Sequence, residues 1–422
     1  MAYSPGVVTI RAIAAGGEGV GRLPNGCTVF VHRTAPGDVV EVAITHRHRR
    51  WARARLVELR RPGEGRRGPP CPLYEDCGGC TLQHLTEEAQ RRAKADIVAQ
   101  ALVRLGGVEL PASPQVIPAP RPWRYRNRMT FVVRRHGSDV VAGLHALGEP
   151  DRLVDVDDRC LLPEPAVSQG WARLRAAWAA RPDLLPPAGE EAHLTVRATA
   201  DGQRLLTVAG GGSGWDVRLL AAASGPWAGV WQRRGDGRLH RLLGAPAADE
   251  MAGEPVRVAG DSFLQVNREA AALLYQEVER QIGAVVGLQV VEAYAGVAIL
   301  SRRLARAGAR VVALEGHPQA AAEARRAGGF QVVTGAVERH LAAALPAAAV
   351  IVNPPRGGLS RAVIATLLAH PPRRLVYVSC DPATLGRDVH LLAARFQLAE
   401  VRCVDLFPQT AHVETVATLT AR

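Results

Sequence analysis

The sequence contains almost no lysine: Lys94 is the only one among 52 basic residues, and arginine supplies the rest. The formal net charge is +12, and such an excess favours a polyanionic partner, because bound cations release the counterions condensed on nucleic acid. Arginine suits phosphate, since its planar guanidinium group pairs bidentately with two oxygens. The charge therefore predicts binding to nucleic acid, although a compositional bias towards Ala, Gly, Pro and Arg could raise it without any such role.

The sequence also lacks a long hydrophobic run. The longest apolar stretch, residues 341–352, is too short to cross a bilayer and contains Pro346. The first 20 residues do not have the charged and then apolar layout of a signal peptide. We therefore expect no membrane association and a cytoplasmic location. With 422 residues, 47% of them hydrophobic, the chain can form two or three domains with cores of their own.

Cysteines are few but clustered. Cys71, Cys77 and Cys80 lie within ten residues, and Cys160 offers a fourth thiol. Disulfides are rare in the cytosol, whereas four thiolates suit either tetrahedral zinc or an iron–sulfur cluster. Zinc modules usually contain two close pairs, and three cysteines plus a distant fourth fit that pattern poorly. We therefore expect an iron–sulfur cluster, the alternative being unpaired structural thiols.

Residues 1–59 alternate short β-like runs with turn signals, a pattern typical of a small barrel. Within this segment, residues 45–55 (THRHRRWARAR) are cationic and surround Trp51. Such a stretch can hold phosphates and stack an aromatic ring on a base, as oligonucleotide-binding barrels do. The alternative is a solvated charged hairpin.

The next part of the chain, residues 60–250, gives a weaker pattern. Residues 60–70 resemble a linker in their Pro, Gly and Arg content, and residues 86–106 are typical of a helix. Two β-like runs follow at 129–135 and 193–199. We expect a mixed α+β domain here, holding the metal cluster.

From residue 251 onwards, helical segments alternate with unbroken apolar runs at 289–296, 309–316, 347–358 and 373–380. This alternation predicts a parallel sheet covered by helices on both faces. Ligands of such sheets bind beyond the carboxyl ends of the strands. There the runs present Glu292 with Gly296, Glu315, Asn353 with Arg356, and Cys380. Glu315 ends the second run, where an acid can accept hydrogen bonds from ribose hydroxyls, but the turn around Gly296 has a single glycine.

Five motifs together resemble one family. SCDPATLGRD (379–388), FLQVN (263–267), NPPRGG (353–358), DLFPQTAHVET (405–415) and the cysteine set around CPLYEDCGGC occur in the family's order over nearly the whole chain. They are similar to the RNA 5-methyluridine (uracil-C5) methyltransferases, in particular the TRAM-domain and iron–sulfur members such as the 23S rRNA uridine methyltransferases. The resemblance implies an α/β protein with an N-terminal OB-like TRAM barrel (1–59), a central cluster domain (60–250) and a Rossmann-like class I methyltransferase domain (251–422).

The resemblance also implies the chemistry. Carbon 5 of uracil is a poor nucleophile, so a thiolate first adds to carbon 6, and a base later removes the proton from carbon 5. The family motifs assign the thiolate to Cys380 and the base to Glu414. Without the resemblance, both would be interpreted as structural residues. The implied ligands are S-adenosylmethionine at Gln265, Tyr294, Gly296, Glu315 and Asn353, and a 4Fe-4S cluster at Cys71, Cys77, Cys80 and Cys160.

Two stretches depart from the family pattern, both on the cofactor side. Asn353 stands where the family usually has aspartate, and Ala298 stands where it has glycine, which adds a methyl group close to the expected ligand. The function expected is methylation of uridine in ribosomal rather than transfer RNA by a monomer. The alternatives are an RNA-binding protein of the same fold with weak or lost methyl transfer, and a methyltransferase of the tRNA uridine-54 type. For methylation of either kind of RNA, the target uracil must leave its base stack to reach Cys380.

Overall fold

The computed structural model describes residues 6–137, 139–260 and 262–422. These residues form two compact units, one comprising the chain up to residue 72 together with 80–120 and 273–422, the other comprising 73–79 and 121–272. This division differs from the three consecutive segments expected from the sequence. The chief difference is that residues 80–120, assigned above to the central domain, group with the barrel and the C-terminal sheet.

The first unit begins with a closed five-stranded barrel in the order β1-β2-β3-β5-β4. Its strands are β1 (Gly6–Ile13), β2 (Gly19–Arg22), β3 (Thr28–Val31), β4 (Val39–Arg47) and β5 (Trp51–Arg61). Alternate residues point inward, so that Val8, Ile10, Val29, Val31 and Val42 form a buried core. The small barrel expected from the alternating pattern is therefore present.

The same unit contains an eight-stranded sheet in the order β18-β17-β16-β19-β20-β22-β21-β6. Its strands are β6 (Gln115–Ile117), β16 (Gln289–Ala293), β17 (Arg310–Glu315), β18 (Gln331–Thr334), β19 (Ala349–Val352), β20 (Arg374–Ser379), β21 (Phe396–Val404) and β22 (Glu414–Ala421). Strands β16 to β20 are parallel to their neighbours within that set, and β22 runs antiparallel between β20 and β21. The four apolar runs predicted as parallel strands correspond to β16, β17, β19 and β20.

Helices of this unit connect or cover the strands. They are α1 (Glu87–Gly106), the C-terminal part of α4 (Arg268–Ile282), α5 (Ile299–Arg306), α6 (Pro318–Ala327), α7 (Val337–His340), α8 (Arg361–Ala369), α9 (Pro382–Leu392) and the 3-10 turn η2 (Ala342–Ala344). The helix expected at 86–106 is α1, and its N-cap is the hydroxyl of Thr86, which accepts a hydrogen bond from Ala89 N at 3.2 Å.

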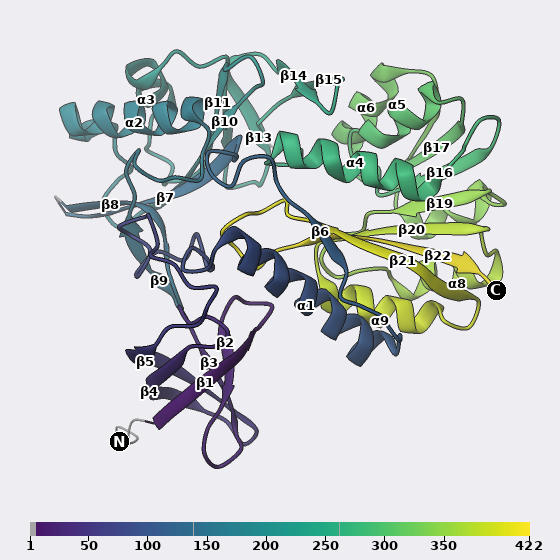
Figure 1. Ribbon diagram of the computed structural model, residues 1–422. Helices are drawn as coiled ribbons and strands as arrows, with labels where there is room; N and C mark the ends of the chain where they lie inside the picture. The colour runs from purple at the N-terminus through teal and green to yellow at the C-terminus, as the bar shows by residue number, and fades with distance from the viewer. Residues whose placement is uncertain (1–5, 138, 261) are drawn as a thin grey trace. The chain divides into compact units, whose positions relative to one another are not determined.

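Two elements explain why residues 80–120 belong to this unit. Helix α1 packs along α9 (Figure 1), and Gly386 permits the close approach, since a Cβ there would lie 2.6 Å from the Ala101 carbonyl oxygen. Strand β6 then pairs in parallel with β21 and completes the sheet edge. The polypeptide therefore contributes to the eight-stranded sheet well before residue 251.

The second unit is built on a seven-stranded sheet in the order β13-β12-β11-β10-β7-β8-β9, with a separate two-stranded ribbon β14-β15. Its strands are β7 (Arg128–His136), β8 (Asp139–Ala146), β9 (Glu149–Asp155), β10 (Glu191–Ala198), β11 (Arg204–Gly210), β12 (Gly229–Arg233), β13 (Leu239–Gly244), β14 (Ala247–Met251) and β15 (Glu254–Val258). Its helices are α2 (Pro165–Ala180), α3 (Val217–Ser224) and the 3-10 turn η1 (Pro182–Leu184). The mixed α+β pattern expected here is confirmed.

An aromatic stack anchors the core of the second unit. Trp171 on α2 is 1% exposed and stacks on Phe131 of β7, with ring centroids 3.9 Å apart and planes 8° from parallel. Its indole Nε1 donates a hydrogen bond of 2.7 Å to the Val156 carbonyl. The stack therefore fixes α2 to the sheet by both apolar burial and a satisfied polar group.

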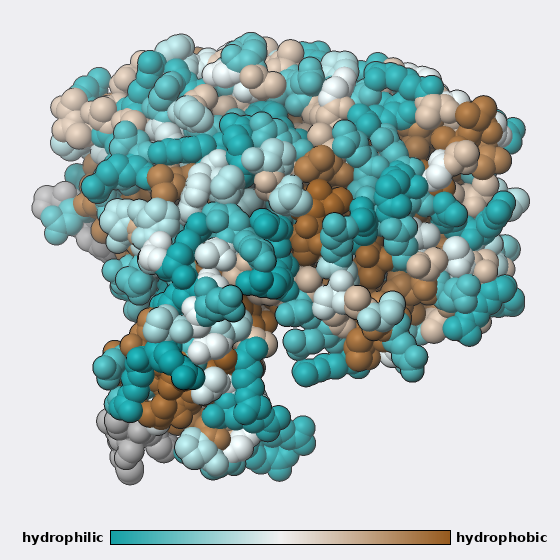
Figure 2. Space-filling model, viewed as in Figure 1, coloured by the Kyte–Doolittle hydropathy of each residue, from teal (hydrophilic) through white to brown (hydrophobic). Residues whose placement is uncertain are grey.

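Within the described part of the chain, we find no helix that is long and apolar enough to cross a membrane. The face of the molecule drawn in Figure 2 is mainly hydrophilic, and its apolar side chains occur in separate groups.

Truncating the aromatic anchor tests this account of the second unit. We expect Trp171→Ala to lower the free energy of unfolding by about 3–5 kcal/mol, because it opens a cavity and removes a buried hydrogen bond. Leu219→Ala is the control, since that side chain on α3 is 50% exposed and its truncation should cost less than about 0.5 kcal/mol. Denaturant titration followed by tryptophan fluorescence measures both changes, and similar losses in the two variants would contradict the account.

Candidate active site

The predicted site residues of the first unit lie in a row along the carboxyl edge of the parallel strands. Glu315 ends β17, Tyr294 follows β16, Asn353 follows β19 and Cys380 follows β20, and these four strands are consecutive neighbours in the sheet. The chain reverses its direction of winding between β16 and β19. Such a switch point is where open α/β sheets bind ligands.

Cys380 and Glu414 are brought together by antiparallel pairing. In the register of β20 and β22, Ser379 lies opposite Thr415. Because the strands are antiparallel, Cys380, which follows Ser379, lies beside Glu414, which precedes Thr415. Residues opposite each other on adjacent strands have Cβ atoms about 5 Å apart. A thiol and a carboxyl group therefore share one end of the sheet, next to the switch point.

The electrostatics of this pair follow from burial. Glu414 is 5% exposed, and desolvation raises the pKa of its carboxyl to about 8, against the smaller lowering effect of Arg356. Desolvation also raises the pKa of the Cys380 thiol, and the nearby Glu414 carboxylate raises it further, while the charge of Arg356 lowers it. Arg356 thus favours the ionised form of both groups.

Arg356 is a charged neighbour of this pair to which sequence reasoning gave no role. It was noted at the end of the 347–358 run, in the motif NPPRGG, but no chemistry was given to it. Its side chain is exposed, yet it is the positive charge that acts on both Cys380 and Glu414. The sequence signal that could have pointed to Arg356 is its position directly after the Pro354-Pro355 pair, at the end of a predicted strand.

Helix α9 holds the loop that carries Asn353 and Arg356. The carboxylate of Asp388 is fully buried and accepts hydrogen bonds of 2.7 Å from Leu359 N and 2.7 Å from the Tyr377 hydroxyl. Arg387 donates to the Gly357 carbonyl at 2.8 Å. The conformation of the loop is therefore set by the same SCDPATLGRD segment that begins with Ser379 and Cys380.

The turn after β16 is closed by Glu315. Tyr294, Gly296 and Ala298 all have left-handed backbone, with φ of 63°, 58° and 58°. The Glu315 carboxylate accepts hydrogen bonds of 2.6 Å from Gly296 N and 2.6 Å from His317 N. Each carboxylate oxygen has two lone pairs, so Glu315 keeps acceptor capacity for a ligand while it fixes the turn.

The space over this turn is open where a cofactor would need it. A Cβ built on Gly296 would meet no atom within 4 Å. Burial, with smaller effects of Glu338 and Asp388, raises the pKa of the Tyr294 phenol to about 12, so its hydroxyl remains a neutral donor. A turn with an open face, a hydroxyl donor and a carboxylate at the strand end fits a ribose-bearing ligand.

The methyl group of Ala298 does not occupy this space. Ala298 is fully buried and packs against Ala313 and Ala324. The left-handed backbone there is unfavourable for alanine by about 1–2 kcal/mol, and the side chain lies in this small apolar cluster.

Gln265 lies in the second unit, unlike the other predicted cofactor residues. Its side chain is 9% exposed, and its backbone carbonyl accepts a hydrogen bond of 3.0 Å from the Asn127 side chain. Asn127 N also donates to the Val266 carbonyl at 2.8 Å. Asn127 therefore fixes the FLQVN segment, a role that the sequence did not indicate.

The four cysteines of the expected cluster are divided between the units. Cys71 and Cys80 belong to the first, and Cys77 and Cys160 to the second. Gly79 N donates a hydrogen bond of 3.4 Å to the Cys77 sulfur. No group of three or more His, Cys, Asp or Glu side chains suited to hold a metal ion occurs among the residues described, so the structure does not confirm the expected ligand set.

Trp51 begins β5 inside a cluster of aromatic and cationic side chains. His48 stacks on its ring with centroids 5.3 Å apart, His46 lies at 5.5 Å, and the Arg53 guanidinium is 5.7 Å from the ring centroid. Residues 45–50 of the adjoining hairpin are partly or fully exposed. The segment has the composition of a nucleic-acid-binding surface and also that of a solvated hairpin.

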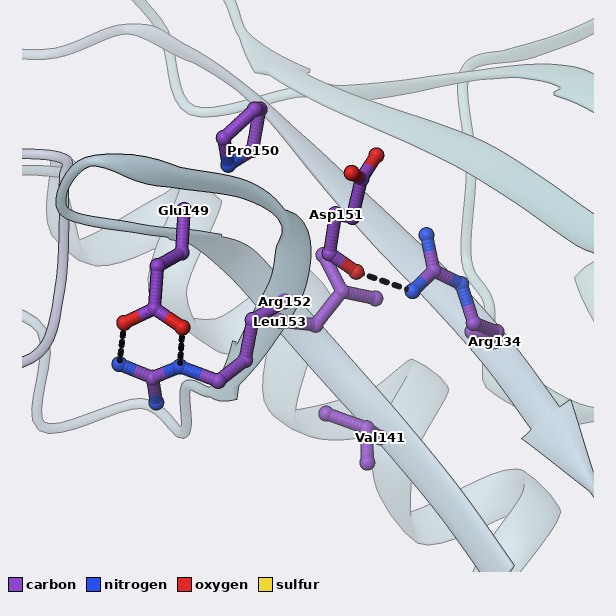
Figure 3. A pocket seen from close by; sticks show the side chains of 7 residues that line it. All are labelled: Arg134, Val141, Glu149, Pro150, Asp151, Arg152 and Leu153. Carbon is purple, nitrogen blue, oxygen red and sulfur yellow. Dashed lines mark hydrogen bonds and ion pairs between the residues drawn. The ribbon is translucent and has the colours of Figure 1, made fainter.

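The second unit contains a hollow of about 590 Å³ beside β8 and β9 (Figure 3). Its two arginines are engaged within it: Arg152 donates to both carboxylate oxygens of Glu149 at 3.2 Å, and Arg134 donates to the backbone carbonyl of Asp151 at 2.6 Å. It includes none of the predicted site residues, so we assign it no function.

Comparison with known proteins identifies the family. The family model described as tRNA (Uracil-5-)-methyltransferase matches residues 341–422, and that of the TRAM domain matches residues 7–57. The 23S rRNA (uracil(1939)-C(5))-methyltransferase RlmD of Chromohalobacter salexigens is 33% identical over 98% of this chain and 89% of its own length. The chain belongs to the RNA uracil-C5 methyltransferase family.

Other relatives of this uracil-C5 methyltransferase agree. A protein of Thermosynechococcus vestitus that is named as an uncharacterized RNA methyltransferase is 34% identical over 97% of each chain. Among solved structures, the tRNA (uracil-54, C5)-methyltransferase of Pyrococcus abyssi in complex with S-adenosyl-L-homocysteine matches 100% of both chains with a TM-score of 0.76 at 22% identity. This likeness shows that the two chains share their fold over their whole length.

Titration of the Cys380 thiol tests the electrostatics of the site. Arg356→Met should raise its pKa, because a stabilising positive charge is lost, and Glu414→Gln should lower it, because a destabilising negative charge is lost. The rate of alkylation of Cys380 by iodoacetamide as a function of pH, followed by peptide mass spectrometry, measures both shifts. Shifts of the same sign in the two variants would show that Cys380 does not sense these neighbours.

Proposed function

We propose that this protein methylates carbon 5 of uridine in RNA through a covalent adduct between Cys380 and carbon 6, using S-adenosylmethionine. The observation that carries the proposal is the pairing of β20 with β22, which places Cys380 beside Glu414 at the switch-point end of the sheet. A nucleophile and a base within reach of one pyrimidine ring are what the reaction requires.

The residues divide the steps between them. The Cys380 thiol loses its proton and its sulfur bonds to carbon 6, which makes carbon 5 an enolate carbon able to take up a methyl group. S-Adenosylmethionine, when bound, supplies that group from its sulfonium. Glu414 then accepts the proton of carbon 5, and the electron pair of that bond restores the double bond as the Cys380 thiolate leaves. Arg356 supports both ionisations.

The cofactor is assigned to the edge of the sheet next to this pair. Glu315, Tyr294, Gly296 and Asn353 would hold the cofactor, and Glu315 would accept hydrogen bonds from its ribose hydroxyls. Support comes from the open space over Gly296 and the free acceptor capacity of Glu315. Gln265, on the FLQVN segment, is assigned to the same ligand through the family motif alone.

Ribosomal RNA is the proposed substrate. The RlmD relative, 33% identical over almost the whole chain, is named as acting on 23S rRNA. The tRNA alternative is favoured by the names of the C-terminal family model and of the Pyrococcus abyssi enzyme, but the likeness to that enzyme concerns the fold only.

We assign the surface around Trp51, formed with His46, His48 and Arg53, to RNA binding because of its aromatic and cationic composition. We also propose that the protein is a monomer located in the cytoplasm.

Substitution of the pair tests the reaction. With S-adenosylmethionine and unmodified 23S rRNA transcripts, Cys380→Ala should abolish formation of 5-methyluridine, and Glu414→Gln should slow it by about 10²–10⁴-fold, the usual contribution of a general base. In wild-type protein the rate should rise with pH up to at least about 8, because Glu414 must be ionised. Full activity of Cys380→Ala would refute the mechanism, and methylation of tRNA but not rRNA transcripts would refute the substrate.

Calorimetry with S-adenosylmethionine separates the enzyme from the second candidate function, an RNA-binding protein that has lost methyl transfer. Binding with a matching loss in Glu315→Gln supports the enzyme. If the protein binds 23S rRNA transcripts but not S-adenosylmethionine, the second function is favoured. The features that suggest this second function are Asn353 and the single-glycine turn after β16.

An iron–sulfur cluster at Cys71, Cys77, Cys80 and Cys160 is proposed from the cysteine spacing and the Gly79 N–H bond to the Cys77 sulfur. We expect anaerobically purified protein to be brown and to contain about four iron atoms per chain, and Cys77→Ala to lose them. Stoichiometric zinc without iron, or neither metal, would refute the assignment.

A further inference from the structure

The segment that leads into Glu414 is irregular but buried. Residues 405–413 connect β21 to β22, and within this connection Asp405, Gln409, Thr410 and Val413 are each 5% exposed or less. Buried backbone outside helices and sheets needs hydrogen-bond partners from elsewhere. Helix α1, which the sequence pattern assigned to a different domain, supplies them.

Lys94 holds the first part of the segment. Its side chain is fully buried, and its Nζ lies 2.5 Å from Asp405 Oδ1 and 3.0 Å from the Phe407 carbonyl oxygen. In a chain where arginine fills every other basic position, this one site uses the compact ammonium group. An ammonium group has three donors and no acceptor, and here Asp405 and the Phe407 carbonyl accept from two of them.

Gln90 holds the second part from one turn earlier on the same face of α1. Its Oε1 accepts a hydrogen bond of 2.9 Å from Gln409 N, and its Nε2 donates one of 2.9 Å to Gln409 Oε1. Gln409 has left-handed backbone, with φ of 69°. A side chain on a rigid helix therefore fixes both the backbone and the side chain of a residue in an unusual conformation.

The residues just before α1 complete the arrangement. The Gln409 carbonyl accepts hydrogen bonds of 2.9 Å from both Thr81 N and Leu82 N, and the Thr81 hydroxyl accepts one of 3.1 Å from Ala411 N. The segment is thus tied down at positions 405, 407, 409 and 411, immediately before β22 begins at Glu414.

We propose that Lys94 and Gln90 are positioning residues, which hold residues 405–413 so that the Glu414 carboxylate is aligned with the proton on carbon 5 of the target uracil. Cys380 lies between β20 and α9, outside this segment. The two residues therefore control proton removal and release of the adduct, and leave formation of the adduct unchanged. This inference rests on the proposed function of Cys380 and Glu414.

The physical basis is the sensitivity of proton transfer to geometry. A displacement of about 1 Å in a reacting group can lower a rate by about 100-fold. Loosening of the segment shifts the start of β22, whereas β20 and its cysteine remain in the parallel sheet. A merely stabilising role for Lys94 and Gln90 would instead affect every step alike.

The test compares Lys94→Met and Gln90→Met with Glu414→Gln. Each protein is incubated with S-adenosylmethionine and 23S rRNA transcripts containing ordinary uridine, and both 5-methyluridine and covalent protein–RNA complex are measured, the latter on denaturing gels. We expect the two α1 variants to form product roughly 10- to 100-fold more slowly and to accumulate covalent complex above the wild-type level, which is also the result expected of Glu414→Gln.

The control is Arg92→Met, on the same helix, where the arginine is exposed and pairs only at the surface with Glu88. It should match wild type in both measurements. If Lys94→Met does not fold, as circular dichroism would reveal, Gln90→Met decides, because it leaves the Lys94–Asp405 pair intact.

Two results would overturn the inference alone: wild-type rates in a folded Gln90→Met protein, or a parallel fall of product and covalent complex. Failure of the proposed function is distinguishable, since wild-type protein would then give no 5-methyluridine and Glu414→Gln no covalent complex, and the inference would fall with it.

Discussion

The site depends on one strand that runs against its neighbours. Strand β22 enters between β20 and β21 in the antiparallel direction, so its first residue meets the end of β20. If β22 were parallel to β20, the residue beside Cys380 would be the last residue of β22 or belong to the loop after it. The reversed strand instead brings a buried carboxyl from the far end of the sequence, Glu414, next to the thiol.

Placing two acidic groups together in a buried position has an electrostatic cost, and the structure shows how it is limited. Burial raises the pKa of both Cys380 and Glu414, and the Glu414 carboxylate raises the pKa of Cys380 further through like charge. Arg356 opposes this from the loop that Asp388 and Arg387 fix to α9. One short motif thus contains the proposed nucleophile, Cys380, and holds the loop that carries Arg356.

Much of this could be predicted from the sequence, because unbroken apolar runs ending in polar residues specify parallel strands and their functional edge. The contribution of β6 could not, since a three-residue strand has no periodicity and its partner β21 lies far along the chain. The pairing of Cys380 with Glu414 was inferred from family motifs, whereas its geometry depends on register. The effect of Arg356 on the pair could not be predicted, because a single exposed arginine gives no pattern in the sequence. The contacts of Lys94 could not be predicted either, because a buried cation gives no periodic signal. The only sign in the sequence was that the chain has no other lysine.

The most direct test of the central claim is to trap the adduct. Fluorine on carbon 5 cannot be removed as a proton, so protein incubated with S-adenosylmethionine and 5-fluorouridine-substituted 23S rRNA should become covalently linked to it. After digestion, mass spectrometry should find the methylated nucleotide attached to the peptide containing Cys380. Attachment at another cysteine, or no linkage from protein that methylates ordinary transcripts, would contradict the account.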